Sequence, residues 1–541
     1  MSTTVASGAE RLAAATELDA RSSGGAAQDD SINAASLCGH LCTLGLSGAY
    51  SDVTVVAFGK RWPLHRVVLA RSLYFRRLFE GDWSDSGDTT LPLTLDDSNA
   101  TSAGLHTCLA WLYGQPLALD SSLVCSVLAC AVFLSLDALG DACVAFITAD
   151  LTDSTFHSYF FFSESANYGP IGDRVRSACW ALLCRCASRE LRHTLHSLPL
   201  GTLASLLTSS ELFASTEMER FQLACDTLAR RWSSVKQWAR PGTGPDADHD
   251  ATVEAVFGPG GIIYSTFTFN DLTAARHTLE AAGAPVSILA AVSDGLWQQT
   301  VLRQQVMAAV AAYERVTPAE PGRTATSQSA ESAESGASAA VTLRFGAEFA
   351  GDLTSLEDGQ ARHGNDVFWA GSWWKVSAQV FASAPATGTA TAPLDGAAPP
   401  ATTSRASGVS SAGRAQLGLF LHRRRADETA LGTVLWADPV VSGASAGHVY
   451  CDSRDRVRAR YQIILSGTPH SLLVLGTLAP ENPAILLPKA PKGWGWRSVG
   501  ALDDVARHPL RVSVAVQLDL GESSAGAGPS TSSAVQPAEG V

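Results

Sequence analysis

The sequence predicts a multidomain protein with an α+β domain, an all-helical segment and a carboxyl-terminal all-β antiparallel sandwich, separated by disordered inserts. Three observations support this fold class. A chain of 541 residues, 46% of them apolar, can form several buried cores. Apolar residues follow strand and then helix periods before residue 240, and alternate in short runs after residue 340. Stretches rich in Ala, Ser, Gly and Pro lie between these parts.

The first part of the chain predicts a disordered arm over 1–32 and an α+β domain over 33–150. Leu37, Leu41 and Leu44 recur at helical spacing, so they form an apolar stripe that precedes the domain core. A Gly59-Lys60 turn joins two short alternating runs into a hairpin. The expected elements are a helix over 35–46, strands over 52–58 and 61–64, a helix over 67–79, a strand over 90–95, and helices over 102–113, 121–134 and 136–148.

The rest of the chain predicts helices followed by strands. Helical spacing dominates 154–232, with breaks at Tyr168-Gly169-Pro170 and Leu198-Pro199-Leu200. Runs such as FWAGSWWKVSAQVF, QLGLFLH and PLRVSVAVQL alternate as antiparallel strands do. The expected segments are a helical domain over 151–238, a linker with a small mixed and helical segment over 239–315, a disordered linker over 316–339, a sandwich over 340–520 with a disordered insert at 382–414, and a disordered tail over 521–541.

Composition limits the classes of function and location. A formal charge of -13 opposes a dominant role in nucleic-acid binding, which depends on clustered Lys and Arg; the run Arg423-Arg424-Arg425 is a local exception. No basic start precedes an apolar core of signal-peptide length, and the longest apolar stretch, between Asp120 and Asp137, is too short to span a membrane. Ten of the 11 cysteines lie between Cys38 and Cys225, which suits buried thiols in a reducing compartment. We therefore expect a cytoplasmic or nuclear location, or both.

Three patterns resemble catalytic or metal sites, and for each the structural interpretation is preferred. Asp52 and His65 flank the hairpin, where they form either a base with its orienting partner or a polar tie between hairpin and helix. Ser445 lies in a G-x-S-x-G pentapeptide that joins two predicted strands, not a strand and a helix. The run around Cys179, Cys184 and Cys186 is helical and apolar, unlike the turns that hold zinc. No catalytic residue, metal or cofactor is expected.

The amino-terminal half resembles a BTB/POZ domain followed by a BACK domain. SDVTVVAFGK, LHRVVL, SLYFRRLF and WLYGQPL occur in the order typical of BTB/POZ domains over roughly 34–150. SANYGPIGDRVRSACWALL and the segment up to LARRW resemble the BACK helices. LARSLYFRRLFEGDWSDS and FLSLDALGDAC are similar to the germ cell-less group of BTB–BACK proteins. FWAGSWWKV, LGLFLHRR, VRARYQIIL and GWGWRSVGALDD resemble a MATH (TRAF-like) sandwich.

These resemblances imply an adaptor without catalytic activity, the substrate receptor of a cullin-3 RING ubiquitin ligase. They place cullin contacts at Leu78 and at Trp83, Ser84 and Asp85, in the loop after the SLYFRRLF helix. The alternative is that Trp83 folds back on its own domain. Asp52 and His65 become structural residues of the BTB fold.

The leucine stripe is expected to mediate homodimerisation. In proteins that the chain resembles, the helix bearing Leu37, Leu41 and Leu44 packs on a second subunit; intramolecular packing is the alternative. The carboxyl-terminal sandwich is expected to bind an unidentified protein substrate. Trp494 and Trp496, two residues apart, are expected on one face of a strand as core and rim residues, and a tryptophan that faces the substrate is the alternative. The alternative function is a structural or nuclear-envelope interaction protein of germ cell-less type that does not recruit cullin.

Overall fold

The computed structural model divides into two compact units, Met1–Cys179 and Trp180–Val541. Each unit is described by itself. The residues described are 39–40, 42–43, 45, 47–81, 89–233, 236–242, 248–316, 341–349, 353–381, 415–425, 450–466, 475–478, 485–488, 493–501 and 509–520.

The first unit contains a three-stranded sheet in the order β2-β1-β3. β1 (Val53–Ala57) pairs antiparallel with β2 (Lys60–Leu64) and parallel with β3 (Thr90–Pro92). Phe58 and Gly59 form the hairpin turn with φ of 49° and 71°, the positive values that a two-residue type I′ turn needs. The turn therefore lies one residue before the predicted Gly59-Lys60, because Lys60 already pairs with Ala57.

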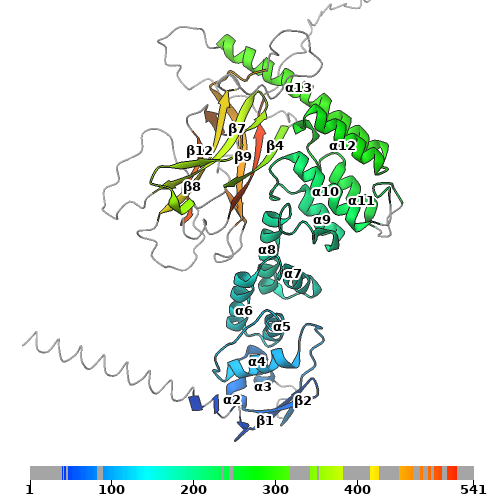
Figure 1. Cartoon of the computed structure of the whole chain (residues 1–541). Helices are drawn as coiled ribbons and strands as arrows, with labels where there is room; N and C mark the ends of the chain where they lie inside the picture. Colours follow the sequence, from blue (N-terminus) through cyan, green and yellow to red (C-terminus); the bar gives the residue numbers. More distant parts are fainter. Residues whose placement is uncertain are drawn as a thin grey trace, which may run out of the picture. The chain divides into compact units, whose positions relative to one another are not determined.

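Helices make up the rest of the first unit (Figure 1). They are α2 (Arg66–Leu69), α3 (Leu73–Glu80), α4 (Ser102–Leu112), α5 (Val124–Phe133), α6 (Asp137–Asp150), α7 (Phe156–Ser165) and the start of α8 (Gly169–Cys186). The three helices predicted from 102 to 148 are confirmed, with ends shifted by a few residues. Thr101 caps α4 by accepting from the N–H of Gly104, and Gly104 lets α4 approach Ser126 of α5 closely. Burial is complete at Leu105, Leu112 and Val127, so α4 and α5 form the centre of this core.

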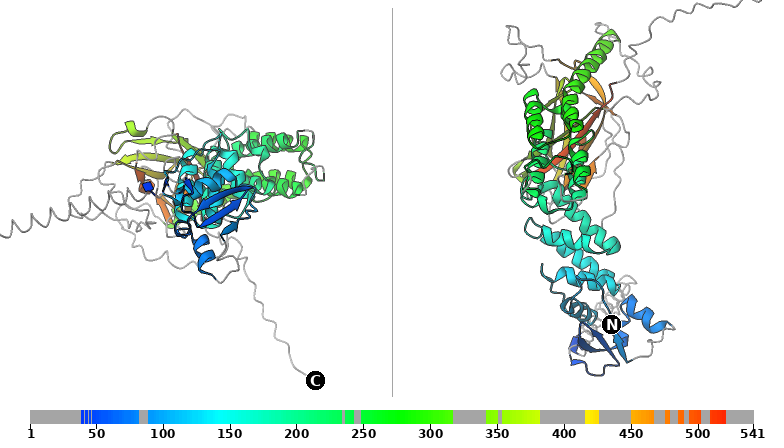
Figure 2. Two further views of the ribbon diagram at one scale, coloured as in Figure 1. Left: turned by 90° about the horizontal axis from the view of Figure 1, so that it is seen from below. Right: turned by 90° about the vertical axis from the view of Figure 1, so that its right-hand side faces the viewer.

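The second unit begins with the end of α8 and a group of helices. These are η1 (Leu195–Ser197), α9 (Leu200–Thr208), α10 (Glu217–Arg231), α11 (His249–Phe257), η2 (Tyr264–Thr266), α12 (Phe269–Ala281) and α13 (Val286–Val316). Thr268 and Asp271 form a capping box at the start of α12, which lies alongside α13 (Figure 2). Edge-to-face contacts join Phe221 to Phe257 and Phe267, which binds α10 to the segment that follows it.

The segment predicted as linker and mixed structure is mainly helical. His249 begins α11 and is only 2% exposed, and its Nε2 lies 2.7 Å from the carbonyl oxygen of Trp238. α13 starts at Val286, eight residues before the predicted start near Asp294. Among the described residues, no helix is long and apolar enough to cross a membrane.

Two five-stranded antiparallel sheets form the carboxyl-terminal part of the second unit. One has the order β10-β9-β13-β4 with β11 also on β9, and the other has the order β12-β8-β7-β5 with β6 also on β7. The strands are β4 (Val341–Phe349), β5 (Ala361–His363), β6 (Val367–Trp369), β7 (Ser372–Phe381), β8 (Gln416–Arg425), β9 (Arg456–Ser466), β10 (Leu475–Leu478), β11 (Ile485–Pro488), β12 (Trp494–Ala501) and β13 (Leu510–Leu518). The predicted carboxyl-terminal strand content is confirmed.

The two sheets share one apolar core. Phe345 of β4, Trp374 of β7 and Val514 of β13 belong to a single buried cluster with residues of β8 and β9. β4 and β13, the first and last strands of this region, pair over nine residues from Val341–Leu518 to Phe349–Leu510. Side chains of β4 alternate, so Leu343 and Phe345 point into the core while Arg344 points away from it.

Candidate protein-interaction sites

Asp52 and His65 are each held by other groups. Oδ1 of Asp52 accepts a hydrogen bond from the backbone N–H of Arg66 at 2.8 Å, at the start of α2. The ring of His65, 9% exposed, lies 2.8 Å from the Tyr113 hydroxyl through Nδ1 and 2.8 Å from the Ala49 carbonyl oxygen through Nε2. A carbonyl oxygen only accepts, so Nε2 donates to Ala49 and the Tyr113 hydroxyl donates to Nδ1. Both residues tie the hairpin to helices, which supports the structural role proposed for them.

Leu78 lies on α3, the helix that leads to the predicted cullin loop. Ser72 caps this helix by accepting from Phe75 N–H at 3.3 Å, and Phe75 is fully buried. Leu78, one turn after Phe75's position on the helix, is half-buried. Val67 of α2 and Leu73 of α3 are 79% and 40% exposed. Apolar surface on α2 and α3 is therefore wider than Leu78 alone, and neither residue was among the predicted cullin contacts.

Several predicted site residues lie outside the described part of the chain. They are Leu37, Leu41 and Leu44 of the predicted dimer stripe, Trp83, Ser84 and Asp85 of the predicted cullin loop, and Ser445 of the G-x-S-x-G pentapeptide.

The helical cysteines of α8 are buried and separate. Burial raises the pKa of the Cys179 and Cys186 thiols to about 12, and raises that of Cys184 as well. Protonated thiols are poor metal ligands. Within the described ranges, no group of three or more His, Cys, Asp or Glu side chains is placed to hold a metal ion.

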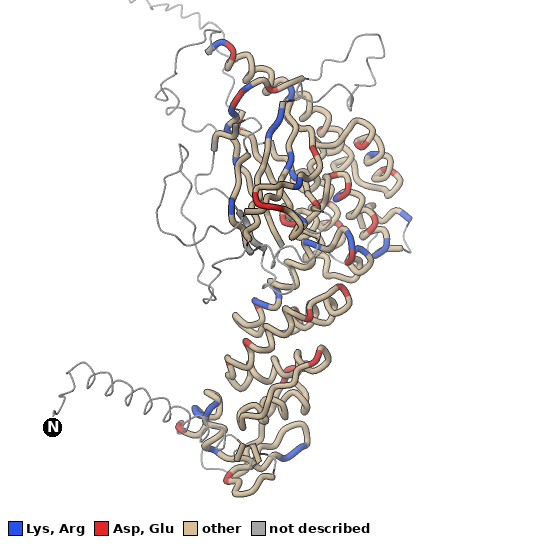
Figure 3. The backbone as a smooth tube through the Cα atoms, turned by 60° about the vertical axis from the view of Figure 1, so that its left-hand side comes forward, with Lys and Arg blue, Asp and Glu red and all other residues tan. Residues whose placement is uncertain are grey.

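Two arginines of the basic run Arg423-Arg424-Arg425 form ion pairs with acidic residues of the same unit. Arg423 is 2% exposed and lies 3.1 Å from Asp452, while Arg424 lies 3.0 Å from Asp366. Figure 3 shows acidic and basic residues interleaved along the second unit. These two arginines therefore serve contacts within the sheets.

Trp494 and Trp496 lie on one face of β12, as their spacing predicts. They pair in register with Leu421 and Leu419 of β8, whose side chains belong to the buried core. Trp496 packs on this core and on Tyr461, with ring centroids 5.8 Å apart, whereas Trp494 is 38% exposed. Trp496 is thus a core residue and Trp494 a rim residue.

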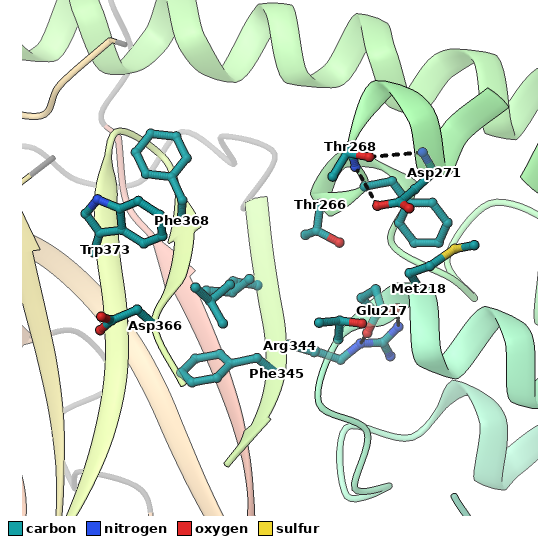
Figure 4. A pocket seen from close by; sticks show the side chains of 14 residues that line it. Glu217, Met218, Thr266, Thr268, Asp271, Arg344, Phe345, Asp366, Phe368 and Trp373 are labelled. Carbon is teal, nitrogen blue, oxygen red and sulfur yellow. Dashed lines mark hydrogen bonds and ion pairs between the residues drawn. The ribbon is translucent and has the colours of Figure 1, made fainter. Parts of the chain in front are cut away.

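A pocket of about 250 Å³ lies in the second unit between its helices and its strands. Figure 4 shows Asp366, Phe368 and Trp373 on the strand side. Met218 and Asp271 line the helical side, and β4 contributes the strand between the two walls. The pocket thus combines an aromatic wall with carboxylates on both sides.

A buried ion pair forms the floor of this pocket. Arg344 of β4 donates from Nε to Glu217 Oε1 at 2.7 Å and from Nη2 to Glu217 Oε2 at 3.0 Å. The two side chains are 8% and 1% exposed. Arg344 also donates to the carbonyl oxygens of Thr208 and Gly261, at 2.6 and 2.7 Å. The first turn of α10 is therefore fixed to the outer side of β4.

Arg220, one turn along α10, is a third buried charge, which contacts Glu217 but does not line the pocket. Its Nε lies 3.3 Å from Glu217 Oε1, and its side chain is 3% exposed. Burial lowers the pKa of Arg220 to about 10. Its other nitrogens donate to three carbonyl oxygens, those of Leu207, Ser209 and Leu212, at 2.6–3.1 Å. One carboxylate thus balances two buried guanidinium groups.

A second ion pair joins the helices to β13. Arg511 donates from both terminal nitrogens to Glu190, at 2.7 and 2.8 Å. This bidentate bond is the main reason that the pKa of Glu190 falls to about 2. Gly346 of β4 completes the junction, because a Cβ there would lie 2.7 Å from the carbonyl oxygen of Ala214. These contacts hold the helices against the sheet that contains β4 and β13.

Comparisons with known proteins bear on the first unit. Residues 43–151 match the family model described as BTB/POZ domain. Germ cell-less protein-like 1 of Mus musculus is 28% identical over 193 residues, which are 35% of this chain and 35% of that protein. Protein germ cell-less of Drosophila melanogaster is 28% identical over 192 residues, 34% of this chain and 32% of that protein. Kelch-like protein 26 of Homo sapiens is 27% identical over 209 residues, 38% of this chain and 32% of that protein.

The chain therefore aligns with about a third of the length of these relatives. The hairpin, the parallel third strand and the helices α2–α6 fall within or beside the segment that the family model matches. Residues 43–151 of the chain form a BTB/POZ domain.

Proposed function

We propose that the chain is a protein-interaction adaptor that serves as the substrate receptor of a cullin-3 RING ubiquitin ligase. The observation that supports this most directly is the BTB/POZ match over residues 43–151, together with germ cell-less and Kelch-like relatives. In this proposal the adaptor is not itself catalytic. The ubiquitin transfer takes place on its partners.

In this proposal cullin-3 binds at α3 and the loop that follows it. Leu78 supplies part of an apolar surface on α2 and α3, to which the exposed Val67 and Leu73 also belong. Trp83 and Asp85 supply an aromatic anchor and a carboxylate, with Ser84 between them. Large aromatic anchors contribute much of the energy of protein interfaces.

Homodimerisation and substrate binding involve the two ends of the chain. In this proposal Leu37, Leu41 and Leu44 pack on a second copy of the chain. Residues 151–238 act as a BACK domain that extends the cullin contact, and residues 340–520 act as a MATH-like domain that binds the substrate. The two antiparallel sheets with a shared core support the MATH-like assignment.

A pull-down with the cullin-3 amino-terminal domain tests the ligase role. The full chain is compared with Trp83→Ala/Asp85→Ala and with Phe58→Ala, a control that removes a 42% exposed aromatic from the hairpin turn of the same domain. We expect binding by the wild type and the control, and a loss of at least tenfold for the double variant. If the folded wild-type chain does not bind cullin-3, the proposal is wrong.

The second candidate is a structural interaction protein of germ cell-less type, acting at the nuclear envelope, whose BTB domain dimerises without recruiting cullin. The strength of the germ cell-less matches favours it. Binding to lamina-type partners without binding to cullin-3 would select this function.

A further inference from the structure

Strand β9 carries three exposed arginines on the outer face of its sheet. Arg456, Arg458 and Arg460 alternate with the buried Val457 and Ala459, so their side chains share the face opposite the core. Residues two apart on one strand repeat at about 6.8 Å. These three residues form an evenly spaced basic row, called here the arginine ladder.

The fold does not use the charge of the arginine ladder. In the described part of the chain, none of its guanidinium groups forms an ion pair, whereas Arg344, Arg423 and Arg511 of the same unit each pair with a carboxylate. Neighbouring like charges repel each other. The ladder therefore adds no attractive contact to the sheet that carries it.

Two carboxylates adjoin the arginine ladder without forming ion pairs with it. Asp455 lies just before β9, where its Oδ2 is 3.3 Å from the hydroxyl oxygen of Tyr313. Asp519 lies just after β13 and donates its backbone N–H to the carbonyl oxygen of Arg458 at 3.0 Å. Because neither carboxylate is paired with a guanidinium group of the ladder, the field directly over the ladder favours an anion.

The outer face of β9 is open, but the edges of the strand are not. The helical segment covers β4 and β13, to which it is bound through Arg344 and Ser513. Gln462 continues the exposed face of β9, and Leu486 of β11, in register with Arg458, is 50% exposed. β13 pairs with β9 along one edge, and β10 and β11 along the other. A partner on this face is therefore bound by side chains and not by addition of a strand.

The face suits an acidic peptide better than a nucleic acid. Single-stranded nucleic acids stack their bases on aromatic side chains, and the one aromatic residue of β9, β10, β11 and β13 is Tyr461, which is 4% exposed and lies in the core. A formal charge of -13 also opposes a phosphate backbone. Carboxylates at alternate positions of an extended segment repeat at about 6.8 Å, the spacing of the ladder.

We propose that the arginine ladder binds an extended acidic segment of the recruited protein, with Asp or Glu at alternate positions. Each carboxylate pairs with one guanidinium group, and such pairs can be bidentate. Leu486 offers an apolar contact beside the middle of the ladder. The inference rests on the proposed adaptor function, for which it identifies a recognition surface and the class of segment recognised.

The test measures fluorescence anisotropy with the full chain and four labelled probes. The alternating peptide is a nonapeptide of Ser and Thr with Glu at its third, fifth and seventh positions. The neutral peptide has Gln at these positions, and the consecutive peptide has its three Glu at the fourth, fifth and sixth positions. The fourth probe is a uridine decanucleotide, which tests the ladder as a nucleic-acid surface.

Two triple variants separate the arginine ladder from the net charge of the chain. The ladder variant is Arg456→Gln/Arg458→Gln/Arg460→Gln. The control variant removes the same number of positive charges from exposed positions of α13 and β12, and is Arg303→Gln/Arg315→Gln/Arg497→Gln. Hydrogen exchange in β9 should be unchanged in the ladder variant, because the replaced side chains are exposed. The single variant Arg458→Gln replaces it if exchange rises.

We expect the alternating peptide to bind the wild type at least tenfold more tightly than the neutral peptide. The consecutive peptide should bind several-fold more weakly than the alternating one, because an extended chain points its central Glu away from β9. The ladder variant should lose at least tenfold in affinity for the alternating peptide, and Arg458→Gln about threefold. The control variant should change this affinity less than twofold. Salt should weaken the binding, because the contacts are exposed.

Four outcomes would overturn the inference. They are equal binding of the alternating and neutral peptides, equal binding of the alternating and consecutive peptides, equal losses in the ladder and control variants, and tighter binding of the decanucleotide than of any peptide. The cullin-3 pull-down is independent of these measurements. Cullin-3 binding without selective binding of the alternating peptide rejects the ladder alone, and the reverse result rejects the ligase role alone.

Discussion

The buried charges beneath the pocket predict a strongly non-additive response to mutation. We consider Glu217→Gln, Arg344→Met and the double variant. Glu217→Gln keeps the size of the side chain but leaves the guanidinium groups of Arg344 and Arg220 buried without a carboxylate. Arg344→Met leaves Glu217 paired with Arg220, at 3.3 Å.

The magnitudes follow from these contacts. Removing one partner of a buried ion pair costs about 3–5 kcal/mol, and Glu217→Gln belongs at the upper end because two positive charges lose their partner. Arg344→Met also costs about 3–5 kcal/mol, since the carbonyl oxygens of Thr208 and Gly261 lose a charged donor as well. In the double variant only Arg220 remains charged, and it keeps its three carbonyl acceptors. The double variant should therefore be less destabilised than the sum of the singles by about 1–3 kcal/mol.

Native-state hydrogen exchange is the appropriate assay, because a multidomain chain does not unfold in one step. Peptides covering α10 and β4 report the free energy of local opening in each variant. Peptides from α4 and α5 in the first unit are an internal control and should not change. Additive effects of the two single variants, to within about 0.5 kcal/mol, would refute the coupling.

Three further predictions concern the same unit. Arg511 lowers the pKa of Glu190 from 4.5 to about 2, so the pair contributes its full stabilisation above pH 4.5 and that stabilisation is lost as pH falls towards 2. The melting temperature of Glu190→Gln should not show this loss in acid. Burial lowers the pKa of His422 from 6.5 to about 4, so stability falls as pH drops from 6.5 to 4, and His422→Gln should flatten the melting profile in that window. Gly346→Ala should destabilise β4 by about 1–3 kcal/mol through overpacking, as measured by hydrogen exchange in that strand. Gly201→Ala, which has open space around it, is the control and should not change this exchange. Equal effects of the two variants would contradict the close approach of Gly346 to Ala214.

The architecture was predictable wherever apolar periodicity is regular. The hairpin, the three helices after residue 100 and the long carboxyl-terminal strands match their predicted positions closely, because apolar residues recur there at strand or helix spacing. The segment before α13 was less clear, since η2 and the capped start of α12 interrupt the helical period. His249 had been assigned to a linker because Pro, Gly and Asp precede it, although its ring is buried.

The ion pair of Glu217 and Arg344 at the pocket could not be predicted from the sequence pattern. Glu217 occupies the first turn of a helix, where an acid is expected for its interaction with the helix dipole. Arg344 occupies an outward position of an alternating strand, where a charge is expected to face solvent. Their 127-residue separation is closed only by tertiary packing. Pairs of this kind cannot be inferred from local periodicity, because each partner satisfies its local pattern alone.

The two acidic residues of the pocket should differ in what they contribute to stability. Glu217 is 1% exposed and bound by Arg344, so Glu217→Gln should raise local opening at α10 and β4. Asp366 is 38% exposed and its ion pair with Arg424 is on the surface, where such pairs contribute roughly 0–1 kcal/mol. Asp366→Lys should therefore change exchange at β4 little. If both variants raised exchange at β4 by the same amount, burial would not be what makes the Glu217 pair important for stability.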